Sequence, residues 1–394
     1  MSSSAPALAL DRAEPSRPLI PALLLFSCAH FLIDMYGMAL GALQPLLRVQ
    51  FGLSLTQAGV LAGVLVFSSS MMQPVYGYLS DRFHTYLFTA LAPALTAIFI
   101  SSLGLASGYW TLLAMVWLGG AGIGSFHPQA TANATRGISA NRGRALAAFI
   151  SAGTLGLSIG PAYFSWVTGT LGLSRTYWAA LPGVAMTGLL LAFLKLSPPA
   201  DSGMKLSFDL TPLRAIRRPL TILFLLVVIR SIVQITFAQF LPLYLRLQRG
   251  YSLPAASYIT SFYLLAGAMG GFTGGNLADR FGGRRVILFS MLCSVPFLLL
   301  FVFTQGPLSI AGLILGGAIL LFTIPVNVMM GQALAPEHGG TVSALMMGAA
   351  WGAAGIFFIP LTGWVSDHYS LQHAFAGLVV VPIAGYLLAL KLPK

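Results

Sequence analysis

The feature that most constrains this chain is the series of long apolar segments that fills it almost from end to end. Short turns that carry Gly, Pro or charged residues separate these segments. Hydrophobic residues make up 57% of the 394 positions, and charged residues only 8%. A water-soluble core cannot cover so much apolar surface, whereas about 20 apolar residues in a helix can span a lipid bilayer. The sequence therefore predicts an all-α integral membrane protein.

Twelve such segments can be distinguished, and each is predicted to be a transmembrane helix. The twelve spans are 19–47, 54–79, 86–106, 109–134, 145–170, 176–195, 219–246, 253–278, 285–304, 307–333, 340–365 and 371–391. The loops between them are too short for a soluble catalytic domain. The sequence also lacks a Walker A loop, an H-E-x-x-H helix and a G-x-S-x-G turn. We therefore expect no enzyme and no cofactor, and a gradient rather than ATP as the energy source.

The net charge of +12 reflects membrane orientation rather than nucleic-acid binding, because the basic residues flank apolar segments. With the N-terminus in the cytoplasm, sixteen of the 21 Lys and Arg residues fall on that side. Positive charge concentrates in cytoplasmic loops, so a multi-pass protein with both termini in the cytoplasm is predicted. Residues 1–18 lack a signal-peptide cleavage pattern and are predicted to be a disordered cytoplasmic tail.

A polar linker at 197–218 divides the chain into two halves, 19–196 and 219–394, each predicted to be a six-helix bundle. The string GYLSDRF at Gly77–Phe83 recurs as GNLADRF at Gly275–Phe281, 198 residues later. Two parallel six-helix repeats are typical of the major facilitator fold, with the substrate site between the halves.

The repeated string resembles the loop G-x-L-x-D-R-[FY]-G-x-R-[KR] of major facilitator transporters, although the first copy lacks the trailing basic residues. We interpret it as a conformational latch, in which Asp interacts with a neighbouring helix end and with Arg until the halves rock. The alternative is that these charges only anchor helix ends. The latch candidates are Gly77, Asp81, Arg82, Gly275, Asp279, Arg280, Arg284 and Arg285.

Three further strings indicate a particular branch of the major facilitator transporters. They are HFLIDMYGMALGALQPLLRVQFGLSLTQAG, SSSMMQPVYGYLSDR and GAGIGSFHPQA. Together they resemble the fosmidomycin-resistance family of major facilitator exporters. The resemblance implies a monomer in the bacterial inner membrane that exports a small compound. Family members commonly carry Glu where this chain has Gln129, so any proton-carrying role of that Glu is absent here.

Asp34 is the one carboxylate of nine that lies deep in an apolar segment. A charge at the bilayer centre costs roughly 2.5 to 3.5 kcal/mol on insertion scales, so it must be paired, protonated or hydrated. We expect Arg230, the basic residue embedded in the seventh segment, as its partner. The hypothesis is that Asp34 takes up and releases a proton, while Arg230 tunes the pKa of Asp34 and attracts an anionic group of the substrate. The alternative is a purely structural pair.

Two histidines are further candidates for proton coupling. His30 precedes Asp34 by four residues and so shares its helical face, and His127 precedes a proline that frees backbone groups. His30 is equally compatible with a packing or interfacial role, and the alternative for His127 is a hydrogen-bonded structural histidine. No metal site is predicted, because nothing in the spacing of His30, Asp34 and His127 shows that they converge.

Other polar residues in apolar segments can line a solute path or form interhelical hydrogen bonds. These secondary candidates are Tyr36, Gln44, Gln129, Asn133, Gln234, Gln239 and Asn327. Gly153, Gly156 and Gly160 are predicted to allow close helix packing.

The preferred function is a proton-coupled antiporter that exports a small anionic or amphiphilic compound. Its expected partners are that compound, protons and the lipid bilayer, with no nucleic acid. One alternative is a symporter or facilitator that imports a nutrient or ion, and another is a non-transporting receptor or scaffold.

Overall fold

The computed structural model describes residues 19–83, 85–135, 138, 142–194, 214 and 216–393, and its regular elements are helices. The predicted tail and most of the predicted linker lie outside this described part. The first half contains α1 (Leu19–Gly37), α2 (Ala39–Phe51), α3 (Leu55–Val66), α4 (Gln73–Arg82), α5 (Leu87–Ser101), α6 (Tyr109–Ala134), α7 (Arg142–Leu171) and α8 (Leu181–Phe193). The second contains α9 (Arg217–Leu247), α10 (Leu253–Phe281), α11 (Gly283–Phe303), α12 (Gly306–Leu320), α13 (Thr323–Leu334), α14 (Gly339–Ser343), α15 (Ala350–His368) and α16 (Leu371–Ala389).

The all-α membrane fold predicted from the sequence is confirmed. Nine helices in the described part are long and apolar enough to cross a bilayer, and a tenth forms if the bent pair Leu55–Met71 and Gln73–Ser80 counts as one span. Leu87–Ser101 is apolar but shorter. The count of twelve spans stays a prediction.

Several predicted spans are interrupted near their middle. Helix α1 ends at Gly37 and α2 begins at Ala39, and a π-helical turn at Phe67–Met71 separates α3 from α4. A second π-helical turn, Ala344–Ala349, precedes α15 in the other half, and the two turns contact each other. Such turns are frequent at functional sites, because they free backbone groups from the regular helical ladder.

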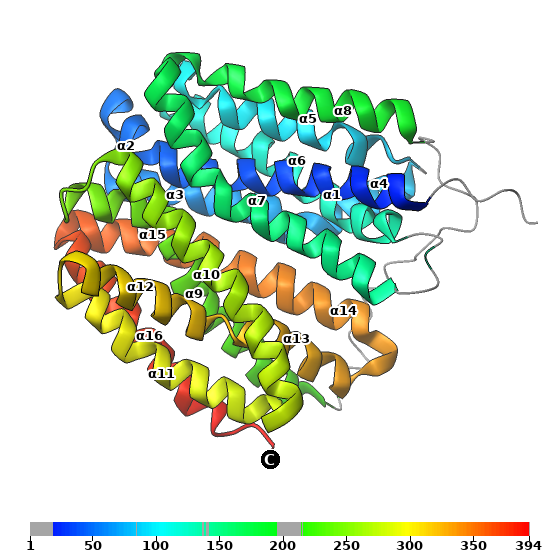
Figure 1. The fold of residues 1–394 in the computed structure, drawn as a ribbon, viewed down its shortest axis with the longest axis vertical. Coiled ribbons are helices and arrows are strands. Elements are labelled where there is room, and N and C mark those ends of the chain that lie inside the picture. Colours follow the sequence, from blue (N-terminus) through cyan, green and yellow to red (C-terminus); the bar gives the residue numbers. More distant parts are fainter. Residues whose placement is uncertain are drawn as a thin grey trace, which may run out of the picture.

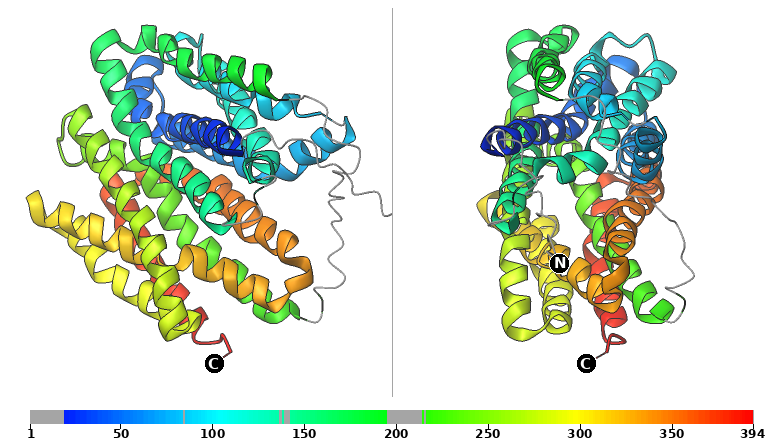
Figure 2. Two further views of the ribbon diagram at one scale, coloured as in Figure 1. Left: turned by 45° about the vertical axis from the view of Figure 1, so that its right-hand side comes forward. Right: turned by 90° about the vertical axis from the view of Figure 1, so that its right-hand side faces the viewer.

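Two helical bundles, α1–α8 and α9–α16, approach each other at one face of the molecule and diverge towards the opposite face (Figure 1; Figure 2). We call the first the outer face. Its turns contain the positive-φ glycines Gly52, Gly172, Gly250 and Gly306. The opposite, inner face bears the start of α1 and the end of α4, and the positive-inside rule predicts that it is cytoplasmic.

Helices α3 and α15 form the tightest contact between the bundles. A Cβ atom at Gly59 would lie 2.7 Å from the Ile359 carbonyl oxygen, and one at Gly363 would lie 2.2 Å from that of Leu55. Neither distance leaves room for a methyl group, so glycine is required where these two backbones meet.

Candidate functional site

The buried acid Asp34 lies between two histidines. Its Oδ2 is 3.2 Å from His30 Nε2, and its Oδ1 is 3.5 Å from His127 Nε2. Asp34 is 9% exposed and lies on α1 with His30, whereas His127 comes from α6. The predicted pair with Arg230 is wrong for this conformation, because the ion pairs formed by Asp34 in the described part are with these two imidazoles.

A backbone carbonyl fixes the orientation of His30. Its Nδ1 lies 2.9 Å from the carbonyl oxygen of Phe149 on α7, and the two rings stack with centroids 4.3 Å apart. A carbonyl oxygen can only accept, so Nδ1 must donate. In the neutral ring Nε2 then carries a lone pair that faces a carboxylate oxygen. The contact therefore needs a proton, either on His30 Nε2 or on Asp34.

Gly153 makes this contact possible. A Cβ atom there would lie 2.3 Å from His30 Nε2 and 2.6 Å from Asp34 Oδ2. The next glycines on the same face of α7, Gly156 and Gly160, abut the carbonyl oxygens of Phe31 and Met35. The predicted close packing of these glycines is confirmed. Their spacing did not reveal that the first of them borders the acid.

The structure also corrects the expectation about convergence. One ligand atom from each of His30, Asp34 and His127 lies within 4.8 Å of the other two. Two imidazoles and a carboxylate are a donor set that a proton or a transition-metal ion can share. A metal ion would have to displace the proton between His30 and Asp34.

Arg230 lies on α9 in the other bundle and is 4% exposed. Its Nη1 donates to Gln234 Oε1, one turn further along, and its guanidinium lies 6.0 Å from the centroid of a Trp351 ring. Its Nε has no hydrogen-bond partner, and no carboxylate within the described part pairs with it. A buried cation that is neither neutralised nor fully hydrogen-bonded is costly in stability.

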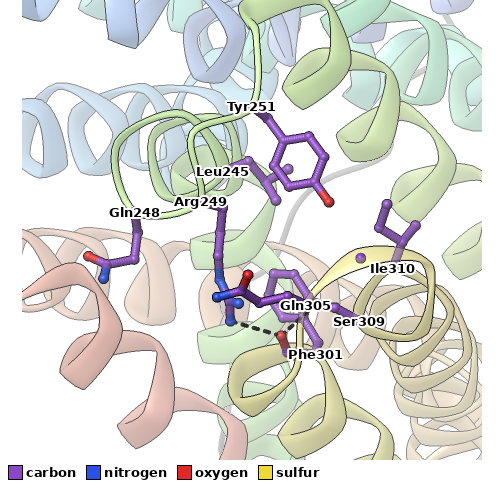
Figure 3. Close-up of a pocket in the computed structure, with 9 residues that line it drawn as sticks. Leu245, Gln248, Arg249, Tyr251, Phe301, Gln305, Ser309 and Ile310 are labelled. Carbon is purple, nitrogen blue, oxygen red and sulfur yellow. Dashed lines mark hydrogen bonds between the residues drawn. The ribbon is translucent and has the colours of Figure 1, made fainter.

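Arg249, at the outer end of the same bundle, is by contrast an arginine whose hydrogen-bond donors have acceptors within the protein. It lines a small pocket with Tyr251, Gln305 and Ser309 (Figure 3). Its guanidinium donates to the carbonyl oxygens of Thr304 at 2.6 Å and Phe301 at 3.1 Å, and to that of Val302. These groups end α11, so Arg249 caps a helix and has little donor capacity left for a ligand.

The secondary candidates divide into two groups. Gln239 and Asn327 bury both of their side-chain polar atoms without partners, and Gln44 Oε1 is also buried without one. Five of the seven candidates, Gln44 included, make contacts within the protein. Tyr36 donates to the Ala179 carbonyl, Gln44 donates to that of Ala58, Gln129 accepts from the Thr89 hydroxyl, Asn133 donates to the Gln129 carbonyl, and Gln234 accepts from Arg230.

The latch candidates make few contacts in this conformation. Asp279 and Arg280 are exposed, and neither takes part in an ion pair in the described part. Arg284 donates to the Leu390 carbonyl, just beyond the end of α16, at 3.1 Å. The Asp81 side chain lies outside the described part. The latch role of the inner-face loops stays a prediction.

Two helical bundles with buried charges between apolar helices are the arrangement expected of a membrane transporter. Residues 25–347, and separately 223–394, match the Major Facilitator Superfamily, and the chain belongs to this family. This finding favours a transporter over the receptor or scaffold alternative.

The chain is 30% identical to the uncharacterized MFS-type transporter YfnC of Bacillus subtilis, over 97% of this chain and 95% of that protein. It is 26% identical to the fosmidomycin resistance protein of Escherichia coli K12, over 92% and 90%. Among solved structures, a bacterial homologue of the lysosomal transporter Spinster, in an inward-facing and occupied conformation, superposes with a TM-score of 0.83. That likeness covers 95% of this chain and 97% of the other at 14% identity, and so concerns the fold alone.

Proposed function

We propose that the protein is a monomeric, proton-coupled antiporter that exports a small organic anion or amphiphile across the bacterial inner membrane. Transport follows from alternating access, with both termini and the inner face in the cytoplasm. In this conformation the halves meet at the outer face, so the substrate enters from the cytoplasm.

One observation carries this proposal: the buried acid and the buried base lie in different halves and do not neutralise each other. The acid has two imidazoles that can share its proton, while Arg230 keeps donor capacity for another group. A proton thus has a binding group in the N-terminal half, and an anion has one in the C-terminal half. Gln239 and Asn327 supply further free donors and acceptors in the C-terminal half.

The names of several relatives agree with export of a toxic compound. Besides the fosmidomycin resistance protein, the chain is 28% identical to the multidrug resistance protein MdtG of Serratia proteamaculans over 75% of its length. It is also 28% identical to a probable nitrate/nitrite antiporter of Thermus thermophilus over 89% of its length. Export and an anionic substrate both have precedent among these names.

Symport of a proton with an anion is the second candidate, because the two ligands carry opposite charges. An anion bound to Arg230 adds negative charge to a medium of low dielectric constant, which increases the affinity of Asp34 for a proton. Binding of the two ligands together is then easier than binding of either alone. Antiport requires instead that binding of the proton and binding of the substrate exclude each other.

The test uses inside-out vesicles, fosmidomycin and a panel of organic anions, with imposed pH gradients of both signs. Antiport predicts accumulation when the lumen is acidic, because protons leave as substrate enters. Symport predicts accumulation when the medium is acidic. Loss of either response in Asp34→Asn would assign the coupling to this acid. Uptake that only equilibrates the substrate and ignores both gradients would indicate a facilitator. Gradient-driven accumulation that persists in the variant would show that the coupling proton binds elsewhere than at Asp34.

A further inference from the structure

At the outer face, a carboxylate from one half caps the N-terminus of a helix in the other half. Asp367, near the end of α15, accepts from the Leu55 backbone N–H at 2.9 Å and from the Thr56 backbone N–H at 2.7 Å. It also accepts from the Thr56 hydroxyl at 2.6 Å. Both partners belong to the first turn of α3.

These bonds depend on the relative position of the two halves. The first N–H groups of a helix have no partner within it, and they form the positive end of the helix dipole. A carboxylate is a strong acceptor for them. Because this carboxylate comes from the other half, its bonds exist only while the outer ends of α3 and α15 meet. Asp367 is exposed, so water can replace its partners when the halves separate.

The sequence around Asp367 repeats the pattern of the predicted inner latches. GWVSDHY at Gly363–Tyr369 resembles GYLSDRF at Gly77–Phe83, with glycine and aspartate four residues apart in both. GNLADRF at Gly275–Phe281 has the same spacing. Helices α4 and α10 run towards the inner face, whereas α15 runs towards the outer face, so the third copy is inverted in the membrane (Figure 1).

The glycine and the aspartate act one turn apart on the same helical face. Gly363 lets the α15 backbone touch Leu55, where any Cβ atom would lie 2.2 Å from its carbonyl oxygen. Asp367 then lies beside the first turn of α3. At the inner face of this conformation, by contrast, Asp279 is exposed and makes no ion pair in the described part.

We propose that Gly363 and Asp367 form an outer latch, the inverted counterpart of the inner-face loops, which stabilises the state that is closed at the outer face. Its release accompanies closure of the inner face. The proposal concerns the positions of the halves and does not depend on the substrate or on the coupling ion.

The outer latch can be tested with two reporters in purified protein in lipid nanodiscs. The native cysteines Cys28 and Cys293 are first replaced by serine. The outer reporter is Ala58→Cys on α3, whose side chain is 1% exposed, and its rate of reaction with a maleimide measures opening. The inner reporter is a spin-label pair at Phe83→Cys and Phe281→Cys. These exposed positions end equivalent motifs in the two halves, and the distance between them measures inner closure.

Asp367→Ala is expected to accelerate labelling of the outer reporter about tenfold and to shift the spin-label distances to shorter values. Asp367→Glu should restore part of both effects. Thr56→Val, which removes one donor and leaves the backbone bonds, should give about a twofold acceleration and serves if Asp367→Ala fails to fold. Glu337→Ala, which removes an exposed carboxylate in the turn between α13 and α14, should change neither reporter.

Faster labelling without a change in the inner distance would reveal local fraying of the helix end and would overturn the proposal. So would unchanged labelling in both Asp367→Ala and Thr56→Val. Because neither reporter needs a substrate or a pH gradient, failure of proton-coupled export would leave this result unaffected.

Discussion

The two halves of the protein share a fold and differ in how they bury charge. In the N-terminal bundle, α1 buries His30 and Asp34 four residues apart, and His127 on α6 approaches the same carboxylate. In the C-terminal bundle, α9 buries Arg230 and pairs it with the half-buried Gln234 at the same spacing, and no carboxylate among the described residues pairs with it. This difference underlies the proposal that the N-terminal half binds the proton and the C-terminal half binds the anion.

Asp34→Asn should have the largest effect. It removes the group that shares the proton with His30, and we expect gradient-driven transport to fall at least about 100-fold while substrate affinity stays within about twofold. Uptake into proteoliposomes measures the first quantity, and equilibrium binding the second. Glu337→Gln is the control, because this exposed carboxylate lies in the turn between α13 and α14 and makes no ion pair with the site. Transport that still responds to the pH gradient would show that the coupling proton does not bind to Asp34 in the N-terminal half.

Arg230→Ala should weaken binding of an anionic substrate by about 10- to 100-fold, the usual loss for a charge-assisted hydrogen bond. Arg230→Lys should recover only part of the affinity, since an ammonium lacks the planar fork of a guanidinium.

Arg249→Ala is the matched control for Arg230→Ala. It removes a satisfied helix cap and should lower thermal stability without changing substrate affinity. Equal loss of affinity in both variants would break the distinction between the two arginines.

Gly153→Ala should reduce gradient-driven transport by about tenfold, because its methyl group would displace His30 and Asp34 from each other. Gly169→Ala, on the same helix with no neighbour within 4 Å of the added Cβ, should leave transport unchanged and slightly stabilise α7. Similar transport in both variants would show that the geometry at Gly153 does not matter for coupling.

His127→Gln should have the smallest effect, a loss of about two- to fivefold in gradient-driven transport. Its contact with Asp34 is the longer of the two, and within the described part no carbonyl accepts from its ring as Phe149 does from that of His30. A loss larger than that of His30→Gln, measured in the same assay, would reverse the assigned order of the histidines.

Much of the fold and part of the site could be predicted because both depend on local sequence. Apolar segment length fixes which residues enter the bilayer, and a lone Asp34 or Arg230 in such a segment is visible from its neighbours alone. The four-residue spacing of His30 and Asp34 likewise predicted a shared face, which their 3.2 Å contact confirms. The partner of Asp34 could not be predicted in this way, since it depends on which helices touch.

The sequence by itself determined that the chain is an all-helical membrane transporter with one buried acid and one buried arginine. Only the tertiary structure decided that the acid belongs with His127, that the arginine pairs with no acid among the described residues, and that Asp367 joins the two halves. The physical reason is the distance along the sequence over which each kind of interaction acts. Hydropathy and helical periodicity act over one or two turns, whereas these contacts join residues 93 to 312 positions apart, whose meeting depends on the packing of whole helices.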